Sequence, residues 1–179
     1  MKNLFFIITA FALGMVTTIG PAAKANNITP TTIVVEKAGT LSTLLSQESM
    51  DTITSLILKG EINGDDVQVL RYMAGRDEDG KVSNGTMSEL DMSEVQIKSG
   101  GSYNYDAYSS QWEILTDGEI PQYMFYQCWS LKKIVLPNQC TGIDASAFED
   151  CQHIEEVIIP EGCKSIGDGA FRHNLFMYL

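Results

Sequence analysis

The stretch IPQYMFYQCWSLKKIVLPNQCTGIDASAFEDCQHIEEVIIPEGCKSIGDGAF (Ile120–Phe171) is the most informative part of the chain, because it repeats at an offset of 23 residues (143 − 120). A regular period of roughly 20–29 residues is typical of solenoids, in which each unit buries its apolar face only against its neighbours. The stretch therefore predicts stacked turns of one ribbon. The matched positions are Ile120/Ile143/Ile166, Phe125/Phe148/Phe171, Cys128/Cys151, Leu131/Ile154, Ile134/Val157, Leu136/Ile159, Pro137/Pro160 and Cys140/Cys163.

A strand template, with apolar residues at relative positions 1, 4 and 6, occurs in four segments. Their first residues are 34, 44 and 23 residues apart (87 − 53, 131 − 87 and 154 − 131). Removing 11 residues (76–86) and 21 residues (98–118) restores the interval of 23 throughout, so we expect two protruding loops there. The segments are Ile53/Leu56/Leu58, Met87/Leu90/Met92, Leu131/Ile134/Leu136 and Ile154/Val157/Ile159.

The fold class that these patterns predict is α/β: a right-handed leucine-rich-repeat solenoid over residues 53–179, with a short parallel sheet. Residues 26–52 predict an N-terminal cap, made of a strand at 31–36 and a helix that begins after Thr40 and ends near Ser49. Such a cap would cover the open end of the stack.

Return segments between the strands predict short helices. Asp65 is expected to cap a helix that ends at Gly75, and three later segments are expected to form one or two helical turns each. The C-terminal repeat is incomplete, because its next strand would start at position 180. We therefore expect an open sheet edge at 157–159, unless the apolar tail 175–179 folds over it. The three later segments are 121–128, 146–151 and 169–173.

The N-terminal residues 1–25 predict a secretion signal peptide. Lys2 precedes an apolar run that ends near Val16, and Ala23-Lys24-Ala25 offers a cleavage site with small residues. A retained membrane anchor is the alternative, although the run is short and Pro21 interrupts it. Cleavage would export the protein to the periplasm, the cell surface or the medium, with no membrane insertion afterwards.

The charge of the remaining chain excludes some partners. Cleavage leaves 10 basic residues (12 − 2) and 23 acidic residues, a net charge of −13. No basic stripe is available to replace phosphate counterions, so we expect no nucleic-acid partner and no binding to anionic lipid. The expected partners are basic or neutral.

Reactive groups are few in this sequence, and we expect no catalytic residues, no metal and no cofactor. The four cysteines occupy two repeat positions, which favours free buried thiols, although stacked pairs could also form disulfides. His153 and His173 are expected at the surface, adjacent acids such as Glu149 and Asp150 are expected to be solvated, and Asp77-Glu78-Asp79-Gly80 is expected to be a charged turn. A hydrolase is the least favoured function.

Two surfaces are candidates for contact with a partner. On the outward row of the sheet, alternating charges and a small apolar patch are expected side by side. In the long insert, aromatic residues lie among Gly, Ser and Asn, as in many binding loops, although the rings could instead cover the coil. The candidate contact residues are Tyr103, Tyr105, Tyr108, Trp112, Lys133, Val135, Glu156 and Ile158, and the expected structural core contains Phe125, Cys128, Leu131, Phe148, Cys151, Ile154 and Phe171.

The repeat unit ID-x-x-AF-x-x-C-x-x-I-x-x-V-x-IP (Ile143–Pro160) resembles the BspA-type leucine-rich repeat, whose pattern is roughly I-x-x-x-A-F-x-x-C-x-x-L-x-x-I-x-L-P. Met124 and Asn174 depart from this pattern, where Ala and Cys are usual. The resemblance implies an exported or surface protein of bacteria with a role in adhesion to host or cell-surface protein or glycan. The alternative is a structural or truncated remnant repeat protein that has no partner of its own and can self-associate through the open edge.

Overall fold

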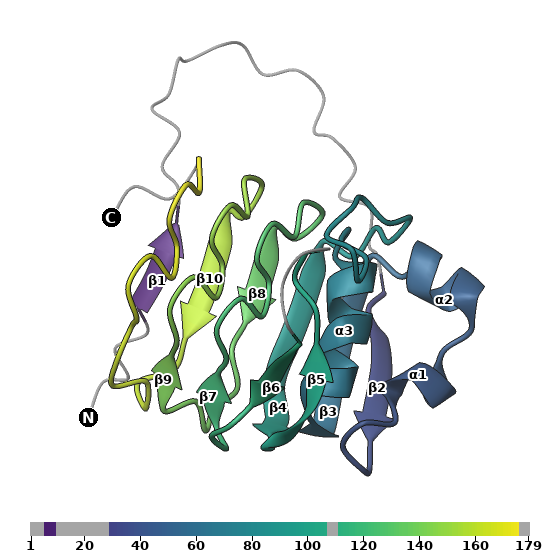
Figure 1. Cartoon of the computed structure of the whole chain (residues 1–179), viewed down its shortest axis with the longest axis horizontal. Helices are drawn as coiled ribbons and strands as arrows, with labels where there is room; N and C mark the ends of the chain where they lie inside the picture. The colour runs from purple at the N-terminus through teal and green to yellow at the C-terminus, as the bar shows by residue number, and fades with distance from the viewer. Residues whose placement is uncertain (1–5, 10–28, 107–110, 176–179) are drawn as a thin grey trace.

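The computed structural model describes residues 6–9, 29–106 and 111–175, with 6–9 described as backbone alone. Five strands form a parallel sheet in the order β2 (Thr31–Val35), β3 (Ser55–Ile62), β4 (Glu89–Ile97), β8 (Lys133–Val135) and β10 (Glu156–Ile159) (Figure 1). The four apolar segments of the strand template therefore contribute to one sheet, and the predicted α/β class with a parallel sheet is confirmed.

A second line of short pairings runs along the other side of the repeats, in front of the sheet in Figure 1. β7 (Glu119–Ile120) pairs with β9 (Gly142–Ile143) in parallel, and Ile143 forms a parallel bridge with Ile166. The return turns are joined in the same way, since Phe125 N–H donates to Ala147 at 2.8 Å and Phe148 N–H donates to Ala170 at 2.7 Å. Residues 23 positions apart therefore lie next to each other in adjacent coils.

The core lies between the parallel sheet and this second set of short pairings. The rings of Phe125, Phe148 and Phe171 form a stack, with centroids 5.6 Å and 5.2 Å apart and interplanar angles of 17° and 4°. Six of the seven residues assigned to the core are fully buried, and Phe171 is partly buried against it. The six are Phe125, Cys128, Leu131, Phe148, Cys151 and Ile154.

The N-terminal helices differ from the prediction. Instead of one helix, α1 (Leu41–Leu44) and α2 (Gln47–Thr52) are separated at Leu45, whose backbone is extended, and Ser46 caps α2. Ser46 and Ser49 provide local hydrogen bonds that compete with a continuous helix.

The helix α3 (Gly64–Met73) packs against the inner face of the sheet, and Asn63 caps it rather than Asp65. Asp66 completes the capping box, but its carboxylate is 1% exposed and also accepts from the N–H groups of Gly39 at 2.6 Å and Leu41 at 2.8 Å. This acid was expected to be solvated. It instead fastens the N-terminal segment to α3.

A further expectation about the repeats was wrong. The three later return segments are turns rather than short helices, because each contains residues in the left-handed region, such as Tyr123 and Ser146, that interrupt helical hydrogen bonding. In the whole chain β1 (Phe6–Thr9) pairs with β10 antiparallel, whereas the open edge expected for the chain without residues 1–25 stays a prediction. The part of the tail at 176–179 lies outside the described residues.

Candidate functional site

Charged side chains form a row on the outward face of the sheet, at the first residues of three strands. Glu89 is in register with Lys133, and Lys133 with Glu156, as the alternating pattern predicted. Lys133 Nζ lies 2.7 Å from Glu156 Oε2, and the Ser55 hydroxyl donates to Glu89 at 3.0 Å. Exposed pairs of this kind contribute only about 0.2–1 kcal/mol each. The row therefore orients side chains on the face more than it stabilises the fold.

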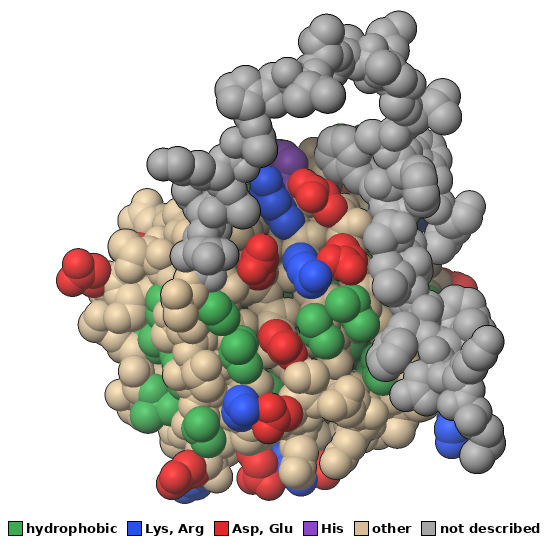
Figure 2. All heavy atoms as spheres, turned by 180° about the vertical axis from the view of Figure 1, so that it is seen from behind, with side chains coloured by type: hydrophobic (Ala, Val, Ile, Leu, Met, Phe, Trp, Pro, Cys, Tyr) green, Lys and Arg blue, Asp and Glu red, His purple; other side chains and the backbone are tan. Residues whose placement is uncertain are grey.

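Apolar side chains occupy the next outward position along the strands. Val135 and Ile158 are partners on adjacent strands, both half-buried, and Ile57 lies in the same row on β3. A hollow of about 200 Å³ lies over β3, β4 and β8, with Pro30, Ile57 and Val135 among its lining residues. Figure 2 shows this face with hydrophobic side chains in two groups, separated by acidic and basic ones. The sheet therefore offers a mixed apolar and charged surface.

The long insert folds back onto α3. It forms an antiparallel hairpin of β5 (Gly100–Tyr103) and β6 (Trp112–Ile114). A Cβ on Gly64 would lie 2.5 Å from the Gly101 backbone, so the hairpin packs directly on the helix.

Tyr103 is 2% exposed, and its hydroxyl donates to the Gln122 carbonyl. Burial raises the pKa of Tyr103. Its assignment to the contact surface was therefore wrong, because the ring lies in the core.

The other aromatic rings of the insert pack on the first return turn. Tyr105 stacks on Tyr123 with ring centroids 4.1 Å apart, and Trp112 meets Tyr123 edge to face at 5.4 Å. Burial raises the pKa of Tyr105. Trp112 is half-buried and lines a hollow of about 140 Å³ together with Pro121. Tyr108 lies outside the described residues. The stacking supports a covering role for Tyr105. Trp112, at the rim of the hollow, remains a candidate for contact with a partner.

Two buried arginines donate hydrogen bonds to the backbone of the first return turn, and the sequence analysis identified neither of them. Arg71 is fully buried, and its guanidinium donates to carbonyls of the insert and of the turn, among them Asn104, Tyr123 and Tyr126 at 2.9–3.2 Å. Arg76 is 7% exposed and donates to Gln127 at 2.6 Å. Burial lowers the pKa of Arg76. Hydrophobic periodicity carries no signal for such partners, because they are backbone atoms.

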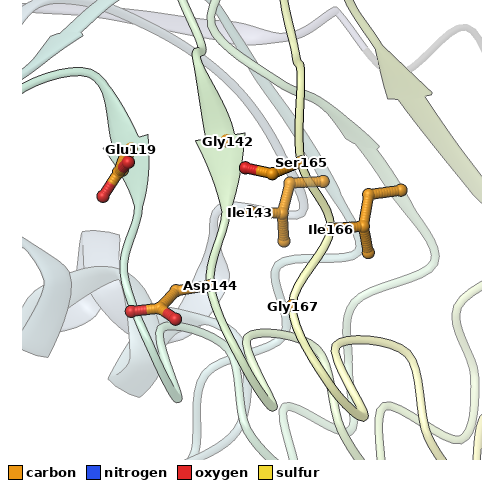
Figure 3. A pocket seen from close by; sticks show the side chains of 7 residues that line it. All are labelled: Glu119, Gly142, Ile143, Asp144, Ser165, Ile166 and Gly167. Carbon is orange, nitrogen blue, oxygen red and sulfur yellow. The ribbon is translucent and has the colours of Figure 1, made fainter.

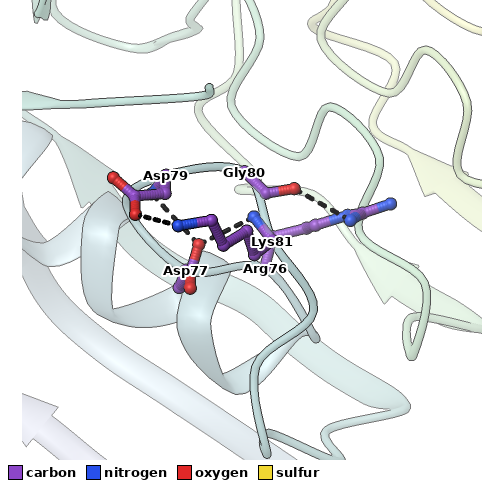
Figure 4. Close-up of polar contacts among 5 residues, drawn as sticks. All are labelled: Arg76, Asp77, Asp79, Gly80 and Lys81. Atoms are coloured by element: carbon purple, nitrogen blue, oxygen red, sulfur yellow. Dashed lines mark hydrogen bonds and ion pairs between the residues drawn. The ribbon is translucent and has the colours of Figure 1, made fainter. Parts of the chain in front are cut away.

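The segment Asp77–Gly80 was expected to be a charged turn. Asp77 Oδ1 accepts from the N–H groups of Asp79 at 3.0 Å and Lys81 at 2.7 Å, and Lys81 Nζ pairs with Asp79 at 2.6 Å (Figure 4). Gly80 accepts from Arg76 at 2.9 Å. These carboxylates close the turn onto itself, which matches the expected charged turn.

The thiols of Cys128, Cys140 and Cys151 are poor nucleophiles. All four cysteines are free, and burial raises the pKa of Cys128 to about 11 and that of Cys140 to about 12. Burial also raises the pKa of Cys151, whose Sγ donates to the Phe125 carbonyl at 2.8 Å. Reactive cysteines instead have depressed pKa values and partial exposure. These three thiols serve as small apolar residues, and those of Cys140 and Cys151 each donate one weak hydrogen bond.

A hollow of about 180 Å³ lies where β7, β9 and the next coil meet (Figure 3). Glu119, Asp144 and Ile166 are among its lining residues, and Figure 3 shows the two carboxylates on the β7 and β9 side, away from Ile166. Pockets for small molecules usually enclose about 300–1,000 Å³. The hollows described on this molecule are smaller, which favours recognition on an extended surface.

A comparison with protein families finds that residues 118–177 match the family described as "BspA type Leucine rich repeat region (6 copies)". The resemblance drawn from the repeat unit is thereby confirmed over this part of the chain. A search among curated proteins found no match. Within the described residues, no helix has both the length and the apolar character needed to cross a membrane.

Proposed function

We propose that the chain is an exported, non-enzymatic binding module, because residues 118–177 match the BspA-type leucine-rich repeat and such repeats suggest protein binding. In this proposal residues 1–25 are removed on export, residues 26–52 cap the stack, and residues 53–179 form a right-handed solenoid with loops at 76–86 and 98–118. The module serves adhesion to a protein or glycan of a host or of another cell surface.

The observation that carries the proposal is the outward face of the parallel sheet. Among the described residues, α3 and the return turns lie on the other face (Figure 1). The outward face keeps the half-buried pair Val135 and Ile158 beside the Lys133–Glu156 ion pair. Partly exposed apolar side chains framed by ordered charges are typical of partner sites.

Capture of the partner tests this face. Immobilised full-length chain is exposed to solubilised host matrix proteins, bacterial surface proteins and a glycan array. Val135→Asp combined with Ile158→Asp is expected to reduce capture at least tenfold, because charge replaces the apolar contact. Leu115→Asp is the matched control, since Leu115 is 83% exposed on the insert side. Equal capture by both variants, with equal thermal unfolding, would remove the sheet face from the proposal.

Export needs a separate measurement. Protein recovered from the culture medium is expected to begin at Asn26 by N-terminal sequencing. Recovery of a chain that still begins at Met1 in the membrane fraction would instead support the retained anchor.

A structural role through self-association is the second candidate, and the pairing of β1 with β10 bears on it. That pairing occupies the β10 edge in the whole chain, and removal of residues 1–25 would expose it. Size-exclusion chromatography of the secreted form decides between the candidates. A dimer or larger species favours the structural role, whereas a monomer that captures a ligand favours the binding module.

A further inference from the structure

The return turns place one side chain of each coil in a row. Gln127, Asp150 and His173 lie 23 residues apart (150 − 127 and 173 − 150), and their φ values are 57°, 59° and 60°. Backbone bonds fix the turns to each other, since Gln127 N–H donates to Glu149 and Asp150 N–H donates to Arg172, both at 2.9 Å. Non-glycine residues uncommonly adopt this conformation, so its repetition shows a rigidly determined backbone.

In two consecutive coils of this row, metal-ligating side chains meet. His173 Nδ1 lies 3.4 Å from Asp150 Oδ1 and 4.0 Å from Glu149 Oε1. One ligand atom of each of these three residues lies within 4.8 Å of the other two. The side chains of Glu149 and Asp150 are 13% and 24% exposed, whereas that of His173 is 63% exposed. The adjacent acids were expected to be independent solvated charges, but the turn brings both to one imidazole nitrogen.

We propose that Glu149, Asp150 and His173 bind a divalent transition-metal cation of the Zn²⁺ class, with one ligand atom from each residue and water completing the coordination. Bonds of 2.0–2.2 Å in a tetrahedral site separate neighbouring ligand atoms by about 3.4 Å, close to the two distances from His173 Nδ1. The exposed imidazole lies against the two more buried carboxylates. Imidazole nitrogen together with carboxylate oxygen suits Zn²⁺ and its neighbours, whereas Ca²⁺ requires six to eight oxygen ligands.

Arg172 is the competitor for this position. Its guanidinium lies 3.6 Å from Glu149 Oε1, the same oxygen that faces His173. The Arg172 side chain is 63% exposed and is free to turn toward solvent when a cation takes its place. Removing the Arg172 charge should therefore strengthen cation binding, which no merely structural ion pair would predict.

Calorimetric titration of the reduced full-length chain with Zn²⁺ tests the site. The expected result is one site per chain, weakened at least tenfold by His173→Ala and tightened several-fold by Arg172→Gln. His153→Ala is the matched control, because His153 is also exposed but faces the Trp129 carbonyl at 2.8 Å. It should change affinity less than twofold, and equimolar Ca²⁺ should not compete.

Binding of Zn²⁺ by cysteine sulfur is the outcome that would contradict the proposal. X-ray absorption of the zinc complex should show nitrogen and oxygen neighbours alone. Sulfur neighbours, with affinity lost in Cys163→Ser and retained in His173→Ala, would overturn the site. The absence of any difference between His173→Ala and His153→Ala, with unchanged circular dichroism, would overturn it equally.

Discussion

The ring of Phe148 lies parallel to the ring of Phe171, at an interplanar angle of 4° and a centroid distance of 5.2 Å. On its other side Phe148 faces Phe125 at 5.6 Å, so it is the middle ring of the stack that joins three coils.

Replacing this middle ring should therefore be costly. Phe148→Ala is expected to lower the free energy of unfolding by about 3–5 kcal/mol, because a fully buried ring leaves a cavity between coils. Phe171→Ala should cost less, since Phe171 is only partly buried. Urea denaturation of the two variants measures the difference. Equal losses of unfolding free energy in the two variants would contradict the prediction that the middle ring contributes more than the end ring.

The buried carboxylate of Asp66 gives a second prediction. Asp66→Ala leaves three backbone N–H groups without an acceptor, those of Gly39, Leu41 and Asn63. The Leu41 donor is buried and the other two are part-buried. A buried donor without a partner costs about 1–3 kcal/mol and a part-buried one costs less, so we expect a loss of at least about 2 kcal/mol. Glu113→Ala, at an exposed position of β6, should change the free energy of unfolding by less than about 0.5 kcal/mol.

Arg71 should resist conservative replacement. Its guanidinium reaches carbonyls of both the insert and the first return turn, through Nε and both terminal nitrogens. A lysine keeps the charge but lacks the planar set of donors, so Arg71→Lys should cost about as much as Arg71→Met. Thermal unfolding of both variants provides the comparison. Near-native stability of Arg71→Lys would mean that charge alone suffices.

Cys128 gives the pH prediction. Its pKa is raised from 9.0 to about 11 by burial, so the folded state holds the proton that the unfolded chain loses first. The stabilisation is complete below pH 9 and is lost as the pH rises toward about 11, by about 3 kcal/mol in total. Other groups titrate in this range, so the measurement is the difference in unfolding free energy between the native chain and Cys128→Ala. A pH-independent difference would contradict the prediction.

Tyr105→Ala separates the two roles of the insert. Because the ring stacks on Tyr123 and meets Tyr126 edge to face, we expect a loss of about 1–3 kcal/mol in stability. A variant that unfolds like the native chain but captures less partner would instead assign Tyr105 to contact.

The sequence predicted those parts of the fold that repeat. The period placed Glu89, Lys133 and Glu156 in register and Phe125, Phe148 and Phe171 in one stack, because each coil meets its neighbour through equivalent positions. It failed where a feature occurs once. Asp66 and Arg71 bind backbone atoms of segments distant in the chain, and side-chain patterns do not reveal such partners.

Among the candidate sites, too, the sequence predicted the one that depends on the repeat pattern and missed the one that depends on local turn geometry. Val135 and Ile158 followed from alternation along strands, and they lie together on the sheet as expected. The cluster at His173 depends on left-handed turns that bring Glu149 and Asp150 to the same side, whereas reasoning from extended strands separates adjacent acids.

The hydrogen bonds from Arg71 to the turn at Tyr123–Tyr126 have a consequence for protein engineering. The segment that matches the repeat family begins at residue 118, yet its first turn is completed by an arginine on a helix that ends at Met73. The boundary of the family match is therefore not the boundary of a unit that can be excised from this chain. Moving these repeats into another protein requires moving the helix with them.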